Sequence, residues 1–396
     1  MSSPSLKGKE VFHTETEKLY YVDQFIQEFP ATVLSCEAGK NGYQVVLDCT
    51  AFYPEGGGQA ADTGTLGDVR VLDTREQGED IVHLCDGPLT AGAQVEGCID
   101  YGLRFARMQQ HSGEHIVSGI LHRRYGCHNT GFHMGGDGIV TVDFDVPFPE
   151  KDLPAIEAEA NAAVWQDLPV RCWYPGAEEL PTIAYRSKKA LPWPVRIVEI
   201  PGFDLCACCG THVRRTGEIG LIKLLGTVNF RGGTRMEMAC GQAAFQLLSR
   251  AYAQNIQVSQ AFSAKPMQTG EAARRMNTLL AQQKYRCGQL ERRIFDSLAA
   301  AYAEQGNVVH FEEGLDGAGL RELADRIAAS CGGMAAVFSG TDDAGYAFCL
   351  ASRREDLRPV CQALTARFPG RGGGKPGFQQ GRIAGTEEQI RAYFQS

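Results

Sequence analysis

Two short stretches, far apart in the sequence, constrain the fold of this chain more than any other feature. The first is His111-Ser-Gly-Glu-His115, and the second is Cys208-Cys-Gly-Thr-His212. In each, two side chains that bind a borderline-soft cation stand four residues apart, and on a helix this spacing places both on one face. Neither pair fills the tetrahedral shell of a zinc ion, so the fold should bring the pairs together. We therefore predict a Zn²⁺ site with four ligands: His111, His115, Cys208 and His212.

A third motif lies upstream of both pairs. Residues 50–59 read Thr50-Ala-Phe-Tyr-Pro-Glu-Gly-Gly-Gly-Gln59, and the Cys208 stretch continues as Val-Arg-Arg-Thr-Gly-Glu-Ile-Gly220. Together the three motifs resemble the editing domain of alanyl-tRNA synthetases and the free-standing alanyl-tRNA editing proteins. The resemblance implies a zinc-dependent hydrolase that removes a wrong amino acid from alanine tRNA.

The cysteine ligand has alternatives. Cys206-Ala-Cys-Cys209 also fits a CxxC pattern, which is typical of redox pairs and zinc knuckles, but no second CxxC completes a four-cysteine site. Register with the family favours Cys208, and Cys206 or Cys209 in its place stays open.

The first histidine pair also fits a protease signature. His111-x-x-Glu114-His115 matches the inverzincin pattern, in which the glutamate acts as general base. That reading leaves the CxxxH stretch and the glycine-rich motif unexplained. Under the editing hypothesis, Glu114 is a residue behind the ligands or on the surface.

Composition limits the class of protein. The chain has 396 residues, of which 43% are hydrophobic and 22% charged, so two or three ordinary globular domains are expected. It has no apolar run long enough to span a bilayer, and Met1 to Glu10 is polar rather than signal-like, so we expect a cytoplasmic protein without a membrane partner. In that compartment, fourteen cysteines indicate metal ligands and buried thiols rather than disulfides. A net charge of -8 does not suggest nucleic-acid binding, but local basic patches decide phosphate contacts.

Residues 11 to about 100 predict a small β-barrel, because short β-branched runs alternate with Gly, Asn and Asp turns. Gly56, Gly57 and Gly58 cannot form a strand interior and would let the backbone approach a ligand closely; an ordinary hairpin tip is the alternative. By resemblance, Thr50 and Gln59 would line a polar pocket for the substrate.

Residues 101–125 predict a helix that carries both histidines of the first pair, since its apolar positions follow a 3.6-residue period. Residues 126–240 alternate strands and helices, which indicates an α+β layer with the metal at one edge. His133 could line the pocket there, or it could be a hydrogen-bonded structural histidine.

Residues 242–305 predict helices, broken near Lys265-Pro266, of which the second could form a coiled-coil arm; a homodimer through this connector is left open. A compact α/β pattern follows. Its stretch Arg371-Gly-Gly-Gly-Lys375 resembles a signature of the C-terminal domain shared by alanyl-tRNA synthetases and DHH-type phosphoesterases. Backbone amides of Gly372, Gly373 and Gly374, with Lys375, could bind RNA phosphate, or the stretch could be a tight structural turn.

The prediction is an α+β chain in four parts: an N-terminal barrel (1–100), a zinc-dependent editing domain (101–240), a helical connector (241–305) and a C-terminal tRNA-binding domain (306–396). No synthetase catalytic core precedes the barrel in this sequence, so we expect editing in trans. The expected substrate is tRNA(Ala) mischarged with serine or glycine. The expected catalytic residues are Thr50, Gln59 and His133, with Gly56 to Gly58 and Arg371 to Lys375 as substrate contacts. A non-catalytic tRNA-binding protein with structural zinc is the alternative.

Overall fold

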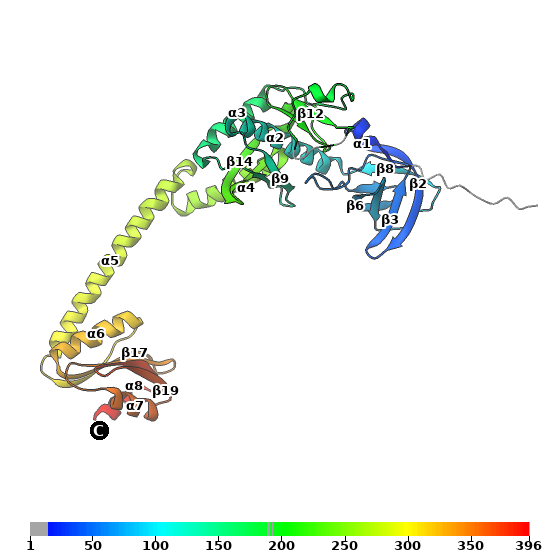
Figure 1. Cartoon of the computed structure of the whole chain (residues 1–396). Helices are drawn as coiled ribbons and strands as arrows, with labels where there is room; N and C mark the ends of the chain where they lie inside the picture. The colour runs from blue at the N-terminus through cyan, green and yellow to red at the C-terminus, as the bar shows by residue number, and fades with distance from the viewer. Residues whose placement is uncertain (1–14, 188–190, 192, 396) are drawn as a thin grey trace, which may run out of the picture. The chain divides into compact units, whose positions relative to one another are not determined.

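The computed structural model describes residues 15–187, 191 and 193–395. The chain divides into two compact units, Met1–Ile256 and Gln257–Ser396 (Figure 1). The class is mixed α+β, as predicted. The polar segment at 1–10, on which the expectation about a signal rests, lies outside the described residues. None of the helices in the described part of the chain combines the length and apolar character needed to cross a bilayer.

The first unit begins with a closed barrel in the strand order β2-β3-β7-β6-β5-β8. Its strands are β2 (Glu28–Gly39), β3 (Gly42–Leu47), β5 (Gly64–Leu66), β6 (Val69–Gln77), β7 (Asp80–Cys85) and β8 (Gln94–Ile99). Inward side chains alternate with outward ones along β7, where Ile81, His83 and Cys85 are buried. The strands predicted from β-branched alternation all lie in this barrel.

Helix α2 (Tyr101–Tyr125) follows the barrel and matches the predicted helix. It is buried almost continuously from Gln110 to Leu121, because it packs against α3 and β15 and shares their apolar core. The sheet of this core has the order β14-β15-β10-β9. Its strands and the second helix are β9 (Asn129–Met134), β10 (Val140–Phe144), β14 (Ile222–Phe230), β15 (Gly233–Cys240) and α3 (Leu153–Trp165).

A second, three-stranded sheet leads to the second ligand pair. It consists of β11 (Arg171–Trp173), β12 (Ile197–Ile200) and β13 (Asp204–Ala207). The chain from Cys208 to Arg214, which we call the ligand loop, connects β13 to the 3-10 turn η3 (Thr216–Ile219).

The four-residue spacing of Cys208 and His212 would place both on one face of a helix, but this stretch is not helical. A Cβ on Gly210 would lie 2.1 Å from Cε1 of His111, so the loop is fitted closely around that ring. The guanidinium of Arg196 donates hydrogen bonds to the carbonyl oxygens of Cys208 and Gly210. In a helix these oxygens would accept from backbone amides of the same helix.

Shorter elements complete the first unit. They are β1 (Glu17–Lys18), α1 (Leu19–Val22), β4 (Cys49–Thr50), η1 (Glu150–Asp152) and η2 (Leu180–Thr182). Strand β4 pairs with β1 in parallel and leads directly into the glycine-rich motif.

The predicted connector consists of α4 (Gly241–Ala261), the turn η4 (Pro266–Gln268) and α5 (Thr269–Ala301). The break lies where Lys265-Pro266 predicted it. Phe295 and Ala299 of α5 are buried in the core of the second unit. A coiled coil formed by α5 stays a prediction.

The second unit is a mixed sheet in the order β16-β17-β18-β20-β19 between two layers of helices. Its elements are β16 (Gly306–Phe311), α6 (Gly317–Ser330), β17 (Gly332–Thr341), β18 (Gly345–Ser352), α7 (Arg358–Arg367), β19 (Gly370–Lys375), β20 (Phe378–Ile383) and α8 (Glu387–Gln395). Ala335 and Val337 of β17 share a core with α6, whereas Ala336 and Phe338 share one with α7 and α8. The glycine-rich stretch 371–375 is thus an edge strand, and only Pro376 and Gly377 form the turn.

Candidate metal centre

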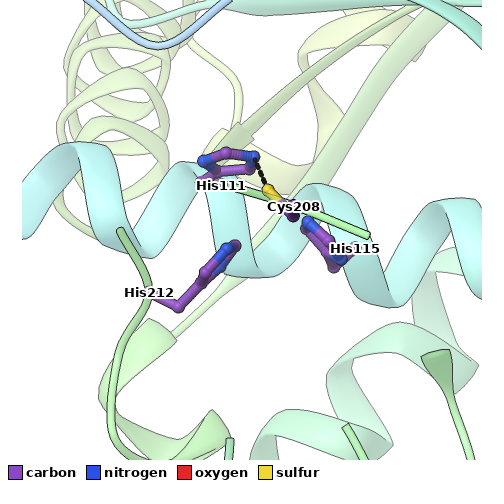
Figure 2. Close-up of side chains that lie close together, drawn as sticks. All are labelled: His111, His115, Cys208 and His212. Atoms are coloured by element: carbon purple, nitrogen blue, oxygen red, sulfur yellow. Dashed lines mark hydrogen bonds between the residues drawn. The ribbon is translucent and has the colours of Figure 1, made fainter. Parts of the chain in front are cut away.

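The two ligand pairs meet in space. Figure 2 shows His111 and His115 projecting from α2 toward Cys208 and His212 of the ligand loop. One ligand atom of each residue lies within 4.8 Å of the others, and Sγ of Cys208 lies 3.4 Å from Nε2 of His111. Zinc bonds of about 2.0–2.3 Å in a tetrahedron place ligand atoms roughly 3.5 Å apart. The distance between Cys208 and His111 matches this spacing, and all four atoms lie near enough to share one ion.

Burial supports a metal reading of this group. The three histidines are 4%, 2% and 0% exposed, in chain order. Nε2 of His212 is buried and has no hydrogen-bond partner in the described structure. A buried polar atom without a partner costs about 1–3 kcal/mol, and a cation among the four ligand atoms would remove that cost.

Nδ1 of each histidine lies at hydrogen-bond distance from a neighbouring side chain, which orients the ring. Nδ1 of His111 lies 3.0 Å from Oε1 of Gln59, and Nδ1 of His115 lies 2.8 Å from Oδ2 of Asp204. Nδ1 of His212 lies 3.3 Å from Oγ of Ser112. Partners of this kind fix the tautomer of metal-binding histidines and leave Nε2 for the ion.

Asp204 is itself held by Arg186, whose Nε and Nη2 donate to its two carboxylate oxygens at 2.7 and 2.9 Å. A second group of candidate ligands, His115, Asp204 and Cys206, overlaps the first. Because Asp204 already pairs with Arg186 and with the far side of His115, we assign it to orienting that imidazole rather than to binding metal.

The cysteines differ in the charge that their surroundings favour. Burial raises the pKa of Cys208, but the charge and hydrogen bond of His111, together with the other nearby histidines, outweigh burial and hold that pKa well below its usual value. Burial raises the pKa of Cys206 to about 11. Since the thiolate is the form that binds metal, the surroundings favour Cys208 over Cys206. Cys209 is exposed and lies outside both ligand groups.

The ligand loop is also fixed through its backbone. Oε1 of Gln24 accepts from the amide of His212 at 2.9 Å. Arg196, which holds two loop carbonyls, lies over the ring of Tyr21 at 5.7 Å from its centroid. The segment before the barrel thus contributes to the geometry of the site.

A cavity of about 600 Å³ opens beside the ligand group. It is lined by residues of the glycine-rich motif, α2, β9 and the ligand loop. These residues are Tyr21, Tyr53, Pro54, Glu55, Gly56, Gly57, Glu76, His111, Glu114, His115, His128, Asn129, Phe132, Arg186, Ser187, Leu191, Cys206, Ala207, Cys208, Cys209 and Gly210. The glycine-rich motif, which the sequence predicted to approach a ligand closely, thus lies at one cavity with His111, His115 and Cys208.

The glycine motif forms a tight turn that packs on β9. The amide and carbonyl of Gly56 pair with those of Gln59, and Gly57 and Gly58 have φ values of 62° and 90°. A Cβ on Gly58 would lie 2.1 Å from the carbonyl oxygen of Phe132, and the ring of Phe132 stacks on His111 with centroids 4.9 Å apart. The turn thereby sits against a ligand.

Three predicted catalytic residues do not line this cavity. Gln59 is fully buried and contacts the site indirectly, through His111 and through Thr211. Thr50 is buried in the barrel, where its Oγ1 lies 2.8 Å from Nε2 of His83. His133 lies on β9 and is exposed. Phe132, the residue before it, lines the cavity instead.

Sequence reasoning missed Asp204, Arg186, Gln24 and Asn129, whose roles depend on contacts between distant segments. Glu114 is neither a ligand nor a surface residue. It is 4% exposed, lines the cavity, and its Oε1 accepts from Ser118 and Asn129. The ligand group contains no glutamate, so the inverzincin arrangement is not favoured.

In the second unit, Arg371 and Gly372 line a separate hollow of about 410 Å³ together with Arg321 and Gln380. Gly373, Gly374 and Lys375 are exposed on the same strand but are not among its lining residues.

Two protein families match parts of this chain. A family described as "Threonyl and Alanyl tRNA synthetase second additional domain" matches residues 195–238, which contain the ligand loop. A second family, "tRNA synthetases class II (A)", matches residues 7–103.

Individual relatives narrow the class. An alanine–tRNA ligase of Thermofilum pendens is 40% identical over 58% of this chain and 27% of its own length. An alanine–tRNA ligase of Pyrobaculum neutrophilum is 31% identical over 98% of this chain and 45% of its own length. The alanyl-tRNA editing protein Aarsd1-A of Xenopus laevis is 36% identical over 54% of this chain and 52% of its own length. The chain thus spans about half the length, or less, of these relatives. The resemblance inferred from the motifs is confirmed: the chain is related to alanyl-tRNA editing proteins and to alanine–tRNA ligases.

Proposed function

We propose that this protein is an aminoacyl-tRNA hydrolase that removes serine, and also glycine, from mischarged tRNA(Ala). The observation that carries the proposal is the convergence of the two ligand pairs and the glycine turn on one cavity. Relatives named for alanyl-tRNA editing support the choice of substrate.

We assign His111, His115, Cys208 and His212 as ligands of zinc. The orphaned nitrogen of His212 and the low pKa of Cys208 support this set. When bound, zinc would supply a Lewis acid beside the cavity and would tie α2 to the ligand loop.

The remaining work falls to the chain itself. An aminoacyl ester is already activated, so the protein must chiefly hold the 3′ end, place a water and exclude competing geometries. Gly56 and Gly57 bring backbone to the cavity wall without side-chain bulk. In this proposal Gln59 orients His111. Neither Thr50 nor His133 lines the cavity, so the proposal gives them no contact with the substrate.

The four-part division predicted from the sequence is retained, with α4 and α5 as the connector. Arg371, Lys375 and the glycines between them are proposed to contact tRNA phosphates, a role supported by their exposure on the edge strand β19. A homodimer through α5 remains a proposal as well. Met276, Leu280, Leu290 and Ile294 leave an apolar stripe exposed on that helix.

The test is deacylation of purified seryl-, glycyl- and alanyl-tRNA(Ala). We expect hydrolysis of the seryl ester and sparing of the alanyl ester. A site that hydrogen-bonds the serine hydroxyl can favour the seryl ester over the alanyl ester by roughly ten-thousandfold. The glycyl ester also lacks that hydroxyl, so it should be hydrolysed more slowly than the seryl ester. Treatment with a chelator should abolish hydrolysis, and added zinc should restore it.

A non-catalytic tRNA-binding protein with structural zinc is the competing function. It predicts tRNA binding without loss of any ester beyond the spontaneous rate. That result, with zinc bound and the fold intact, would refute the hydrolase proposal.

A further inference from the structure

Glu114 and Asn129 lie side by side in the wall of the cavity, and each has one oxygen that can still accept a hydrogen bond. Nδ2 of Asn129 donates to Oε1 of Glu114 at 2.5 Å, and Oγ of Ser118 donates to the same oxygen. The carboxylate can only accept, so this bond assigns nitrogen and oxygen of the asparagine amide. Oδ1 of Asn129 is then the atom left over.

That atom has no partner. Asn129 is 6% exposed, and its Oδ1 is buried without a hydrogen bond in the described part of the chain. Among the described residues, none donates to Oε2 of Glu114 either. Both residues line the cavity. Buried acceptors are normally paired, so the unpaired Oδ1 of Asn129 calls for a donor from outside the protein, and Oε2 of Glu114 offers that donor a second acceptor in the same cavity wall.

The donor should be a cation. One of the two acceptors is a carboxylate, and an ammonium group offers three N–H donors, whereas a hydroxyl offers one. Charge-assisted bonds are about twice as strong as neutral ones, particularly where water is excluded.

We propose that Glu114 and Asn129 bind the free α-ammonium group of the aminoacyl ester. The inference rests on the proposed hydrolase function and adds to it a substrate requirement: the enzyme acts on esters of amino acids with an unblocked amino group. His111 and His115, which flank Glu114 along α2, line the same cavity, so an ester held by its ammonium group lies next to the ligand group. Peptidyl esters and N-acylated esters would lack the charge and would be excluded.

Two substrates separate this role from recognition of the side chain. One is seryl-tRNA(Ala), and the other is its deaminated analogue, in which a hydroxyl replaces the α-amino group and the serine side chain is retained. We expect the wild-type protein to favour the seryl ester in kcat/KM by at least tenfold.

Glu114→Gln should lower kcat/KM for the seryl ester by at least tenfold and leave that for the deaminated ester within twofold. Asn129→Ala should reduce the preference in the same direction but by less, because the carboxylate remains. Glu55→Gln is the matched control, since Glu55 is another carboxyl residue that lines the cavity. It should keep the preference. Bound zinc, measured for every variant, separates these effects from loss of the metal.

Equal losses on both esters in Glu114→Gln would indicate a general catalytic or structural role and would overturn the inference. An equal loss of preference in Glu55→Gln would replace specific binding by a diffuse negative field and would also overturn it. A wild-type protein that does not distinguish the two esters overturns it directly. If the wild-type protein hydrolyses neither ester, the proposed function itself fails.

Discussion

Single side chains decide which atoms of the site can bind metal. Gln59, Asp204 and Ser112 each occupy Nδ1 of one histidine, so the three Nε2 atoms are the ones left for an ion. The two adjacent cysteines also differ in role, because Cys208 belongs to the ligand group and Cys209 does not. The site can therefore be tested one atom at a time.

Cys208→Ser and Cys209→Ser form a matched pair of variants. Serine is a poor zinc ligand, so the first variant should lose most of its bound zinc during dialysis against a mild chelator. The second should retain about one ion per chain, because all four proposed ligands remain. Metal analysis after gel filtration measures both, and zinc loss in Cys209→Ser alone would move the ligand assignment to Cys209.

His83 makes the barrel sensitive to acid. It is fully buried against Thr50 and the carbonyl of Val45, and burial lowers its pKa from 6.5 to about 4. Between these values the unfolded chain binds a proton that the folded barrel does not, so stability falls as pH decreases from about 6.5 to about 4. The shift corresponds to about 3 kcal/mol at most.

We expect amide hydrogen exchange in β3 and β7 to show a loss of about 2–3 kcal/mol of local stability between pH 7 and pH 4.5. His83→Gln keeps a hydrogen-bonding side chain and cannot be protonated, so it should remove most of that pH dependence. A variant that loses as much stability as the wild type would exclude His83 as the source.

At the scale of elements, the glycine turn and α2 are joined in two places. The turn packs on β9, whose Phe132 stacks on His111. Behind the turn, Nε of Arg104 in α2 donates to Asp62 at 2.7 Å, and both side chains are almost completely buried. Breaking such a pair by removing one partner typically costs about 3–5 kcal/mol. The contact between Arg104 and Asp62 therefore holds α2, which carries His111 and His115, against the N-terminal part of the chain.

Gly58→Ala and Gly57→Ala test the packing of this turn. Both glycines have positive φ, so each substitution should cost about 1 kcal/mol in backbone strain. Only at position 58 would the new methyl group meet the backbone of β9, whereas a Cβ on Gly57 meets nothing within 4 Å. We expect deacylation to fall at least tenfold further in Gly58→Ala than in Gly57→Ala. Equal activities would show that contact with β9 does not matter.

Elements with a strong local pattern were predictable, and contacts between elements were not. The 3.6-residue period of 101–125 gave α2 with its observed ends, and β-branched alternation located the barrel strands. The CxxxH spacing suggested a helix, but Gly210 forms part of a loop because it lies against His111. Helices α7 and α8 were missed. The stretch at 371–375 is a strand because it pairs with β20, and a Cβ on Gly372 would meet Phe348 and Cys361; neither contact is visible in the sequence.

The candidate site shows the same division. Spacing and residue type selected four candidate ligands, and the structure brings one atom of each within 4.8 Å of the others. Gln24 contacts His212 across 188 residues of sequence, and Asp204, although close to Cys208 in the chain, contacts His115 across 89 residues, so no local period marks either role. Thr50 and His133 were chosen from their motifs, which carry no information on which way a side chain points from its strand.

At the scale of the whole molecule, the ligand group and the glycine-rich strand β19 belong to different compact units. The ligand group and the cavity are built entirely from the first unit. The second unit has its own sheet and two cores. This arrangement predicts that chemistry and tRNA affinity can be separated.

A fragment of residues 1–264, which ends in the break between α4 and α5, should bind zinc and deacylate a short seryl acceptor-stem helix at close to the wild-type rate. Its affinity for full-length tRNA should fall at least tenfold, because the proposed phosphate contacts of Arg371 and Lys375 are removed. Filter binding and single-turnover deacylation measure the two effects. Unchanged tRNA affinity would argue against a binding role for the second unit.

The link from Gln59 to His111 and from Gln24 to His212 has a consequence for biogenesis. Both glutamines come from the N-terminal part of the chain, and both act on residues of the ligand group. A newly made polypeptide in which Gln24 and Gln59 have not yet packed on the ligand group offers loosely held imidazoles and should bind metal weakly. Metal uptake would then come late in maturation and would report that the upstream part has folded, which guards the nascent protein against trapping a cation in a misassembled form.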